Sequence, residues 1–377
     1  MTGLKTEQQK ISIIDLTAHY NSIKSEIDVA IAEVLKSGHY VMGPNVQSLE
    51  KELANYLSVQ NVISCANGTD ALVLALKALD IGSDDEVITV SHSFFATSEA
   101  IALVGAKPVF IDIQEEDFNI DTKQIEKAIT KKTKAIIPVH LYGQPCEIEK
   151  VVEIGKKYNL KVIEDCAQAI GAKYNGRYVG TFGDIGTVSF FPTKNLGAFG
   201  DAGAIITNND EIAKKLRALR VHGSSQRYVH DLIGLNSRLD EIQAAILRVE
   251  LKYLDEWNKK RLRAANYYTE KLKEIRGVVL PNIKSNVSHV FHQYTIKIPK
   301  RDLICEKLRE SNIETIIYYP IPIHMQKAFS YLSCGEGFLP VTEKICKQIL
   351  SIPIYPEITK ETQDHVINSL QELTEKL

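Results

Sequence analysis

Two residues have the clearest chemical meaning in this sequence, the lysine Lys194 and the aspartate Asp165. Lys194 lies in the segment SFFPTKNLGAFGDAG, whose apolar and glycine-rich composition favours partial desolvation of an ammonium group. Desolvation lowers the pKa of a lysine, which suits an amine nucleophile that forms Schiff bases. A lysine of this kind considered alone is more often a loop-edge residue whose charge stays in water, so the residues around it decide the interpretation.

Asp165 ends a short apolar run, LKVIED, which follows the helix-like segment EIEKVVEIGKKYN. A helix followed by an apolar strand is typical of a parallel α/β sheet, and carboxylates at the carboxyl ends of such strands point into the ligand crevice. An enzyme that uses pyridoxal phosphate needs an amine to bind the aldehyde and a carboxylate to keep the pyridine nitrogen protonated. Lys194 and Asp165 are those two residue types. The alternative for Asp165 is a helix N-cap.

A candidate phosphate site lies upstream in the segment VISCANGTDALVLAL. An apolar strand there runs into Asn-Gly-Thr-Asp and then into a helix, so free backbone N–H groups and the Thr69 hydroxyl could hold a phosphate at Gly68 and Thr69. Taken alone this signal is weak, because simple helix capping by the same residues is the more common explanation.

The chain resembles the DegT/DnrJ/EryC1/StrS group of pyridoxal phosphate-dependent nucleotide-sugar aminotransferases. The resemblance runs nearly end to end, through the blocks CANGTDAL, AIIPVHLYGQ, VIEDCAQAIGA, SFFPTKNLGAFGDAGAI, GLNSRLDEIQAAIL and YYPIPIH. It implies fold type I of the aspartate aminotransferase superfamily, an α/β fold with a large, mainly parallel-sheet domain and a small α+β C-terminal domain. We expect the large domain with an N-terminal helical cap over residues 1–250 and the small domain over 251–377.

The resemblance also implies roles for individual residues. Lys194 would be the catalytic lysine that binds the cofactor, pyridoxal 5'-phosphate, and Asp165 the partner of its pyridinium nitrogen. The other cofactor-binding residues would be Gln168 at the ring hydroxyl oxygen, Gly68, Thr69 and Ser189 at the phosphate, Phe94 stacked on the ring, and Asn236 reaching the phosphate of the neighbouring subunit. Composition alone makes core packing an equal alternative for Phe94.

The substrate side is implied at Arg238, again from the neighbouring subunit, and at Tyr318, Tyr319 and His324. The two prolines of YYPIPIH break regular structure and hold the backbone extended, so this rigid turn could aim Tyr319 and His324 into a pocket or could be a structural edge loop. The chain departs from the family at Tyr318, where many members carry His. We expect no metal site, because His289 and His292 have no accompanying ligand cluster.

Composition fits a cytoplasmic enzyme. The chain has 377 residues, 44% of them hydrophobic, and a formal net charge of -2, which argues against disorder and against nucleic-acid binding. The six cysteines are scattered without CxxC or zinc-type spacing, so we expect reduced thiols. The start, MTGLKTEQQK, has no apolar signal core, and no apolar run reaches the ~18 residues of a membrane span.

The hydrophobic pattern predicts how these residues are positioned. Residues 17–36 read as a helix stopped by Gly38, and a second helix starts at Gly43-Pro44. From about residue 61 strands and helices alternate, which predicts a mainly parallel sheet with helices on both faces and Lys194 on the loop between strands VSFF and AGAIITN. Residues 239–275 read as one long helical connection, and VFHQYTIKI and ETIIYY read as pieces of the C-terminal layer.

We therefore expect a homodimeric aminotransferase that takes nitrogen from L-glutamate and aminates carbon 3 of a UDP-linked 2-acetamido-3-oxo sugar, for surface polysaccharide or lipopolysaccharide. The alternatives are a dTDP-linked 3-oxo-6-deoxyhexose, a 4-oxo sugar, and a non-catalytic regulatory protein with the same fold. A sugar dehydratase of this fold would carry histidine at Lys194, and a nicotinamide oxidoreductase would show GxGxxG after the first strand, which VISCANGTDAL lacks.

Overall fold

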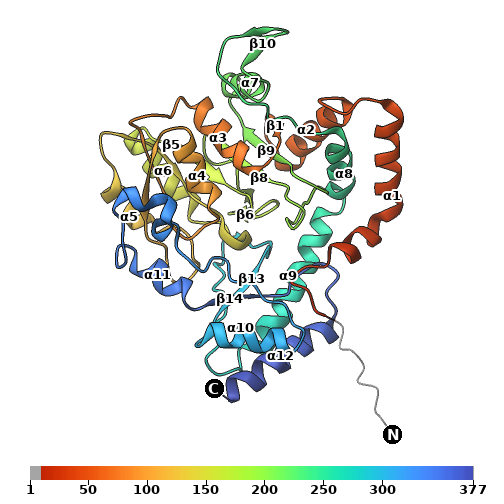
Figure 1. The fold of residues 1–377 in the computed structure, drawn as a ribbon, viewed down its shortest axis with the longest axis vertical. Helices are drawn as coiled ribbons and strands as arrows, with labels where there is room; N and C mark the ends of the chain where they lie inside the picture. Colours follow the sequence, from red (N-terminus) through yellow and green to blue (C-terminus); the bar gives the residue numbers. More distant parts are fainter. Residues whose placement is uncertain (1–9, 377) are drawn as a thin grey trace.

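A seven-stranded sheet forms the centre of the structure, a computed structural model that describes residues 10–376 (Figure 1). Its strand order is β1-β9-β8-β5-β4-β2-β3, and every neighbouring pair is parallel except the two pairs made by β9. The predicted mainly parallel sheet is therefore confirmed. The strands are β1 (Asn61–Cys65), β2 (Glu86–Val90), β3 (Lys107–Ile111), β4 (Thr133–Ile137), β5 (Lys161–Asp165), β8 (Ile185–Ser189) and β9 (Gly203–Thr207).

Helices cover both faces of this sheet because its strands are apolar on both sides. One hydrophobic cluster joins the sheet to α3 (Gly68–Ala78), α4 (Ala96–Leu103) and α7 (Asp210–Leu219). The other cluster joins it to α2 (Pro44–Leu57), α5 (Thr122–Ala128), α6 (Ile148–Tyr158) and α8 (Glu241–Leu251). Successive residues of β9 alternate between the clusters, with Ala204 and Ile206 in one and Ile205 in the other.

The two N-terminal helices form as the sequence predicts. Helix α1 (Leu16–Ser37) ends at Gly38, whose φ of +68° lies in the left-handed region that favours glycine. Helix α2 begins with Pro44 in its first turn, where the missing N–H costs no hydrogen bond. Both helices contact α8 along the side of the sheet. The first nine residues, most of the segment predicted to carry no signal core, lie outside the described part of the chain.

The C-terminal layer has its own hydrophobic cluster below the sheet in Figure 1. It is built from α9 (Leu254–Leu272), α10 (Arg301–Glu310), α12 (Lys360–Glu375) and the antiparallel pair β13 (Tyr294–Lys297) and β14 (Ile349–Ile352). The predicted single helical connection is divided, since α8 and α9 are separate helices. The predicted strand VFHQYTIKI is shorter, because residues 289–293 are not paired. ETIIYY contributes only an isolated bridge from Ile316 to Ser351.

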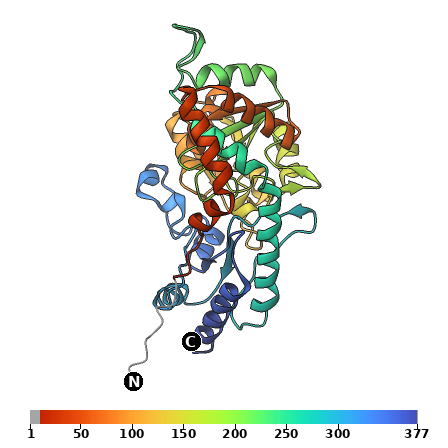
Figure 2. The ribbon, with the colours of Figure 1, turned by 90° about the vertical axis from the view of Figure 1, so that its right-hand side faces the viewer.

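Smaller elements complete the fold. A hairpin of β10 (Ser224–Gln226) and β11 (Val229–His230) projects beyond α7 in both views (Figures 1 and 2). A three-stranded sheet contains β6 (Lys173–Tyr174), β7 (Arg177–Tyr178) and β12 (Val287–Ser288). Three 3₁₀ turns at 141–143, 323–325 and 327–332 and the helix α11 (Pro340–Cys346) fill the remaining connections. Within residues 10–376, no helix is long and apolar enough to cross a membrane.

Candidate active site

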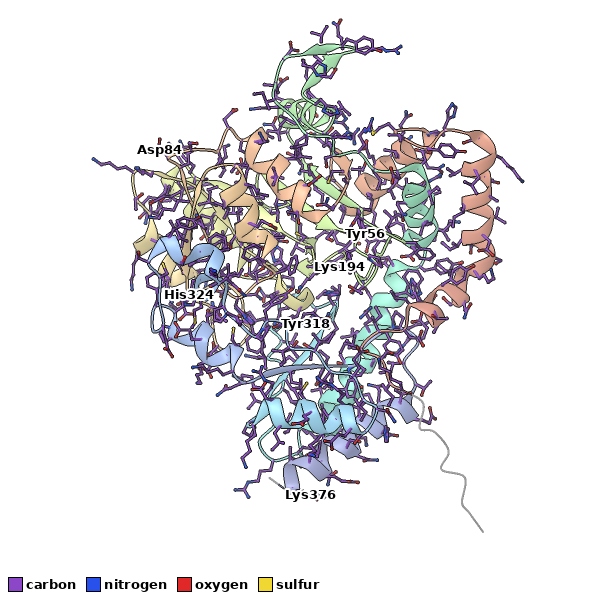
Figure 3. All side chains as sticks on the ribbon, in the orientation of Figure 1. Tyr56, Asp84, Lys194, Tyr318, His324 and Lys376 are labelled. Carbon is purple, nitrogen blue, oxygen red and sulfur yellow. The ribbon has the colours of Figure 1, made fainter. Side chains whose placement is uncertain are left out.

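Lys194 lies on the loop of residues 190–202 that joins β8 to β9, close to the centre of the molecule (Figure 3). The loop is tightly folded, since the N–H of Lys194 donates to the Phe191 carbonyl and the N–H of Ala198 to the Phe190 carbonyl, each at 2.8 Å. Burial lowers the pKa of Lys194 to about 8, although the negative charge of Asp165 opposes this shift. About a tenth of the amine is therefore neutral at pH 7, far more than for an ordinary lysine.

Asp165 is the last residue of β5 and is buried. Its Oδ2 accepts a hydrogen bond from the Thr97 hydroxyl at 2.8 Å, and its Oδ1 accepts one from the Ala167 N–H at 3.1 Å. Burial raises the pKa of Asp165, while these two donors and the charge of Lys194 act in the opposite direction. A carboxylate in this position can hold a cationic ring N–H in a site from which water is largely excluded.

Gly68 and Ser189 form the base of a cradle beside the start of α3. A Cβ on Gly68 would lie 2.7 Å from the Ser189 Cβ, so only glycine lets the helix start approach the end of β8. Asn67 caps the helix by accepting from the Asp70 N–H at 2.8 Å. Within residues 10–376, the N–H groups of Gly68 and Thr69 donate to no protein acceptor. These amides at a helix start can bind an anion.

The Gln168 side chain is fixed in orientation by two partners. Its Oε1 accepts from the N–H of Tyr142 at 2.6 Å, and its Nε2 donates to the Tyr319 hydroxyl at 3.1 Å. The oxygen is therefore engaged, and the second N–H of Nε2 is the group still able to donate to a ligand. The structure thus brings Gln168 and Tyr319 together.

The aromatic residues Phe94, Tyr319 and Tyr318 lie next to one another. The Phe94 ring is 57% exposed and its centroid lies 5.9 Å from that of Tyr319. Tyr318 lies below Lys194 in Figure 3, and its carbonyl accepts a hydrogen bond from the Tyr142 hydroxyl. The exposed Phe94 ring beside Tyr319 is open to stacking by a planar ligand.

The structure does not bring His324 to this group. His324 is buried, and its ring lies well away from Lys194 in Figure 3. Its Nδ1 lies 2.7 Å from the Ser91 Oγ and its Nε2 lies 3.2 Å from the Glu343 Oε1. Both ring nitrogens are therefore engaged within the protein, and neither is available to a ligand in this arrangement.

Asn236 and Arg238 lie on an extended segment whose side chains alternate between solvent and core. Both are exposed, and within residues 10–376 neither side chain makes a hydrogen bond or ion pair. Between them, the buried Ser237 hydroxyl accepts from the Ala66 N–H at 3.2 Å, so the segment lies against the chain just before Gly68. Two polar side chains directed outward next to the cradle can reach a second molecule or a ligand.

Two further residues of the site were not assigned from the sequence. Thr97 holds Asp165, but a threonine in the first turn of a helix gives no sign that it faces a strand 68 positions later. Tyr142 orients Gln168 through its backbone, with φ +57°, and its hydroxyl lies 3.1 Å from the His92 Nε2. A positive φ at tyrosine is not readable from residue type. His289 and His292 are buried, which holds the pKa of both rings low.

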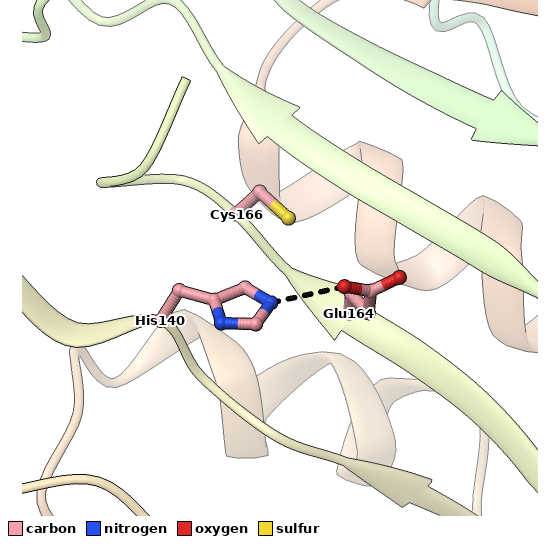
Figure 4. Close-up of side chains that lie close together, drawn as sticks. All are labelled: His140, Glu164 and Cys166. Carbon is pink, nitrogen blue, oxygen red and sulfur yellow. Dashed lines mark hydrogen bonds and ion pairs between the residues drawn. The ribbon is translucent and has the colours of Figure 1, made fainter. Parts of the chain in front are cut away.

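A second cluster, His140, Glu164 and Cys166, has the composition of a metal site (Figure 4). The His140 Nε2 donates to Glu164 at 3.1 Å, and its Nδ1 accepts from the Cys146 N–H at 3.1 Å. The Glu164 oxygens also accept the N–H groups of Gly180, Phe182 and Gly183. The ligand atoms of His140 and Glu164 are thus engaged within the protein, and burial raises the pKa of the Cys166 thiol, so this cluster fixes the turn after β7 and is poorly suited to binding a metal.

The donor set around Lys194 fits pyridoxal 5'-phosphate. A lysine whose amine is readily neutral can bind an aldehyde, a buried carboxylate can pair with a ring N–H, and free amides beside Gly68 can bind a phosphate. The exposed Phe94 ring offers a stacking surface for a planar heterocycle.

Comparison with known proteins agrees with this geometry. The model of the DegT/DnrJ/EryC1/StrS aminotransferase family matches residues 21–371. The chain is 50% identical to the "pleiotropic regulatory protein" of Geobacillus stearothermophilus, over 96% of this chain and 98% of the relative. It is 46% identical to the UDP-N-acetyl-3-dehydro-alpha-D-glucosamine 3-aminotransferase of Acidithiobacillus ferrooxidans, over 94% of this chain and 96% of the relative. It is 45% identical to the dTDP-3-amino-3,6-dideoxy-alpha-D-galactopyranose transaminase of Aneurinibacillus thermoaerophilus, over 96% and 98%.

The fold is similar to solved structures over almost its whole length. The crystal structure of NtdA from Bacillus subtilis with the bound cofactor PMP superposes with a TM-score of 0.92 and 38% sequence identity. The match covers 98% of this chain and 86% of that chain.

Proposed function

This chain belongs to the DegT/DnrJ/EryC1/StrS aminotransferase family, and from that membership we propose that it aminates carbon 3 of a UDP-linked 2-acetamido-3-oxo sugar with L-glutamate as donor. At the coarser level it is a nucleotide-sugar aminotransferase of fold type I whose cofactor is pyridoxal 5'-phosphate. The observation that carries the activity is the pair of Lys194, with its lowered pKa, and the buried Asp165.

The bound cofactor supplies an electron sink for the carbanion that remains when a proton leaves the substrate carbon. In our proposal the neutral Nζ of Lys194 accepts that proton and returns it later, because the pKa of the amine is near that of a general base at neutral pH. Asp165 keeps the ring nitrogen protonated, and Gln168 donates from Nε2 to the ring oxygen. Gly68, Thr69 and Ser189 bind the phosphate, and Phe94 stacks on the ring.

The substrate-binding residues are assigned from the aromatic residues near Gln168 and from the exposed segment that contains Asn236 and Arg238. We assign Tyr318 and Tyr319 to the sugar, and Asn236 and Arg238 to the phosphate and the substrate of a partner subunit. Support comes from their position: both exposed polar side chains lie next to the cradle without an internal partner among residues 10–376. We assign His324 an indirect role, holding the turn after Tyr319 through Ser91 and Glu343. A homodimer with shared sites is part of the proposal, as is a cytoplasmic location.

The preference for a UDP-linked acceptor rests on the relative from Acidithiobacillus ferrooxidans, and the relative from Aneurinibacillus thermoaerophilus supports the dTDP alternative at nearly equal identity. The test is to incubate enzyme and glutamate with a panel of UDP- and dTDP-linked 3-oxo and 4-oxo sugars and to identify products by mass and NMR. A 3-amino product from the UDP-linked acetamido sugar, formed at the highest kcat/KM of the panel, is the expected result. Preferred amination of a dTDP-linked or 4-oxo acceptor would contradict it.

The relative named as a regulatory protein raises a second candidate, a regulator without catalysis. Such a protein has no need for Lys194, Asp165 and Gln168 to be held together, which favours the enzyme. Two experiments on purified protein decide between them. In the first, borohydride should fix pyridoxyl phosphate covalently on Lys194. In the second, untreated protein should transfer the amine of glutamate to the cofactor, whereas a regulator without catalysis would transfer no amine.

A further inference from the structure

His19 lies between two carboxylates that come from distant parts of the chain. On α1, its Nε2 lies 3.0 Å from the Glu250 Oε1, and its Nδ1 lies 3.6 Å from the Glu357 Oε1. The side chains of His19, Glu250 and Glu357 are only 16%, 1% and 18% exposed. The Trp257 ring of α9 packs on the imidazole with its centroid at 4.3 Å. One imidazole thus joins the helical cap, the end of α8 and the segment after β14.

Glu250 continues from His19 to the loop of Lys194. Its second oxygen, Oε2, accepts a hydrogen bond from the Gly197 N–H at 3.0 Å. Gly197 leaves no space for adjustment, since a Cβ there would lie 2.5 Å from the Pro192 carbonyl oxygen. A displacement of Gly197 would therefore also move the backbone next to Lys194.

The negative charges of Glu250 and Glu357 are matched only if His19 is protonated and Arg261 supplies the second positive charge. Burial alone would lower the pKa of His19, but the hydrogen bonds and charges of Glu250 and Glu357 outweigh burial and raise it to about 9. Burial raises the pKa of Glu250, and His19 is the main group that opposes that rise. Arg261 of α9 contributes charge near Glu357, and Tyr355 lies near both Glu357 and Asp15, the N-cap of α1.

We propose that the His19 imidazolium is a positioning residue for Lys194. It keeps Glu250 ionised, and ionised Glu250 holds Gly197 in place. Gly197 in turn holds the lysine loop, residues 190–202, which carries Lys194. The relevance for catalysis rests on the proposed function. Loss of this cation leaves the buried Glu250 carboxylate without its counter-charge, which is expensive, so Glu250 takes up a proton and its hydrogen bond to Gly197 weakens.

The test compares His19→Gln, Glu250→Gln and the double variant, with His39→Gln as control because His39 is exposed. Glutamine at 250 is a neutral acceptor for Gly197, as protonated Glu250 is. In cofactor-free protein, we expect amide exchange of Gly197 to accelerate at least about tenfold in His19→Gln and in Glu250→Gln, and the double variant to exchange no faster than the faster single variant. Unchanged exchange in His19→Gln, or effects that add in the double variant, would overturn the proposal.

Two further readouts test the charge coupling of His19 to the carboxylates. The folded-state pKa of His19 lies above its ordinary value of 6.5, so its contribution to stability is complete below about pH 6.5 and is lost as pH rises through about 9. The difference in Tm between wild type and His19→Gln should follow that course, and a difference independent of pH would count against the proposal. If His19→Gln does not fold, the pKa of His19 in Glu250→Gln, followed by NMR, must fall, and an unchanged value overturns the coupling.

Steady-state kinetics of the enzyme with bound pyridoxal phosphate test whether His19 affects catalysis. We expect His19→Gln to lower kcat with KM for the sugar nearly unchanged, because the loop rather than the sugar site is loosened. Equal kcat in wild type and His19→Gln would sink the positioning role. Failure of wild-type protein to bind pyridoxal phosphate at Lys194 would instead refute the proposed function, and the exchange measurement in cofactor-free protein would still decide on the His19–Glu250–Gly197 connection.

Discussion

The Thr97 hydroxyl donates a 2.8 Å hydrogen bond to Oδ2 of Asp165 and lies 2.9 Å from the Ser93 Oγ. Asp165 is buried, which by itself raises its pKa, and Thr97 is the strongest group that opposes the rise. A short chain of hydroxyl groups thus favours the ionised form of an aspartate that is needed as the partner of a cation.

Replacing Thr97 by Val should therefore raise the pKa of Asp165 further. Because protonated Asp165 cannot hold a ring N–H, the acid limb of the kcat profile should move to higher pH, and kcat at neutral pH should fall about tenfold or more. Ser93→Ala, which removes a hydroxyl that does not touch Asp165, should shift the profile much less. An acid limb at the same pH in Thr97→Val and wild type would contradict this role.

The reactivity of Lys194 should depend on pH in a characteristic way. Only the neutral amine attacks an aldehyde, and the pKa of Lys194 is about 8, so adduct formation by cofactor-free protein should accelerate as pH rises and level off above about 8. An ordinary lysine would continue to gain reactivity up to about pH 10.4. Borohydride trapping with peptide mapping measures this. The exposed Lys214 offers the control, since Lys214→Ala should leave the profile unchanged.

Amine transfer from glutamate to the cofactor should require Lys194 as a base. In single-turnover experiments, Lys194→Ala should slow this conversion by at least about 10²-fold, the lower range for a general base. The spectral change of the cofactor provides the measurement. Conversion at the wild-type rate in the variant would exclude Lys194 from proton transfer.

Gly68→Ala should weaken cofactor binding. The new Cβ would lie 2.7 Å from the Ser189 Cβ, so the start of α3 and the end of β8 must separate and the phosphate donors move with them. Overpacking of this kind costs about 1–3 kcal/mol, and we expect Kd for pyridoxal phosphate to rise at least about fivefold. Gly335→Ala is the matched control, because its Cβ would meet open space. Equal affinities of Gly68→Ala and wild type would argue against the cradle.

Shared active sites predict complementation between inactive subunits. A hybrid of Lys194→Ala and Asn236→Ala subunits contains one site with both native residues, if Asn236 acts on the partner subunit. At complete exchange of equal amounts, about half of the dimers are hybrids with one intact site, so activity should return to about a quarter of wild type. Mass spectrometry checks the exchange. No recovery after confirmed exchange would place Asn236 in its own subunit's site.

Much of the scaffold could be predicted because the apolar runs have strand length and the helices carry strong terminal signals. Gly38 ends α1 and Pro44 begins α2 as expected, and the loop between VSFF and AGAIITN carries Lys194. These features depend on local sequence. The division of residues 239–275 at Lys252 and Tyr253 was missed, because helical periodicity does not stop there and no glycine or proline marks the break.

The contacts within the site depend on tertiary structure and were harder to predict. His324 lies in a rigid Pro-rich turn, which made a substrate-binding role plausible from the sequence. The fold instead directs its ring toward Ser91 and Glu343. Thr97, Tyr142 and His19 act through residues more than 25 positions away, and a single sequence carries no signal for such pairs. The roles of Gly68, Phe94, Asn236 and Arg238 stay predictions until the variants above are measured.

Strand β9 also limits how long the lysine loop can be. Its register with β8 pairs Ser189 with Gly203, and Ile205 faces one apolar layer while Ala204 and Ile206 face the other. Removing one residue from 190–202 and keeping the same pairing positions would turn each β9 side chain to the opposite layer. A length change in this segment must therefore be absorbed within the loop that carries Lys194, because the alternative reverses the packing of a whole strand.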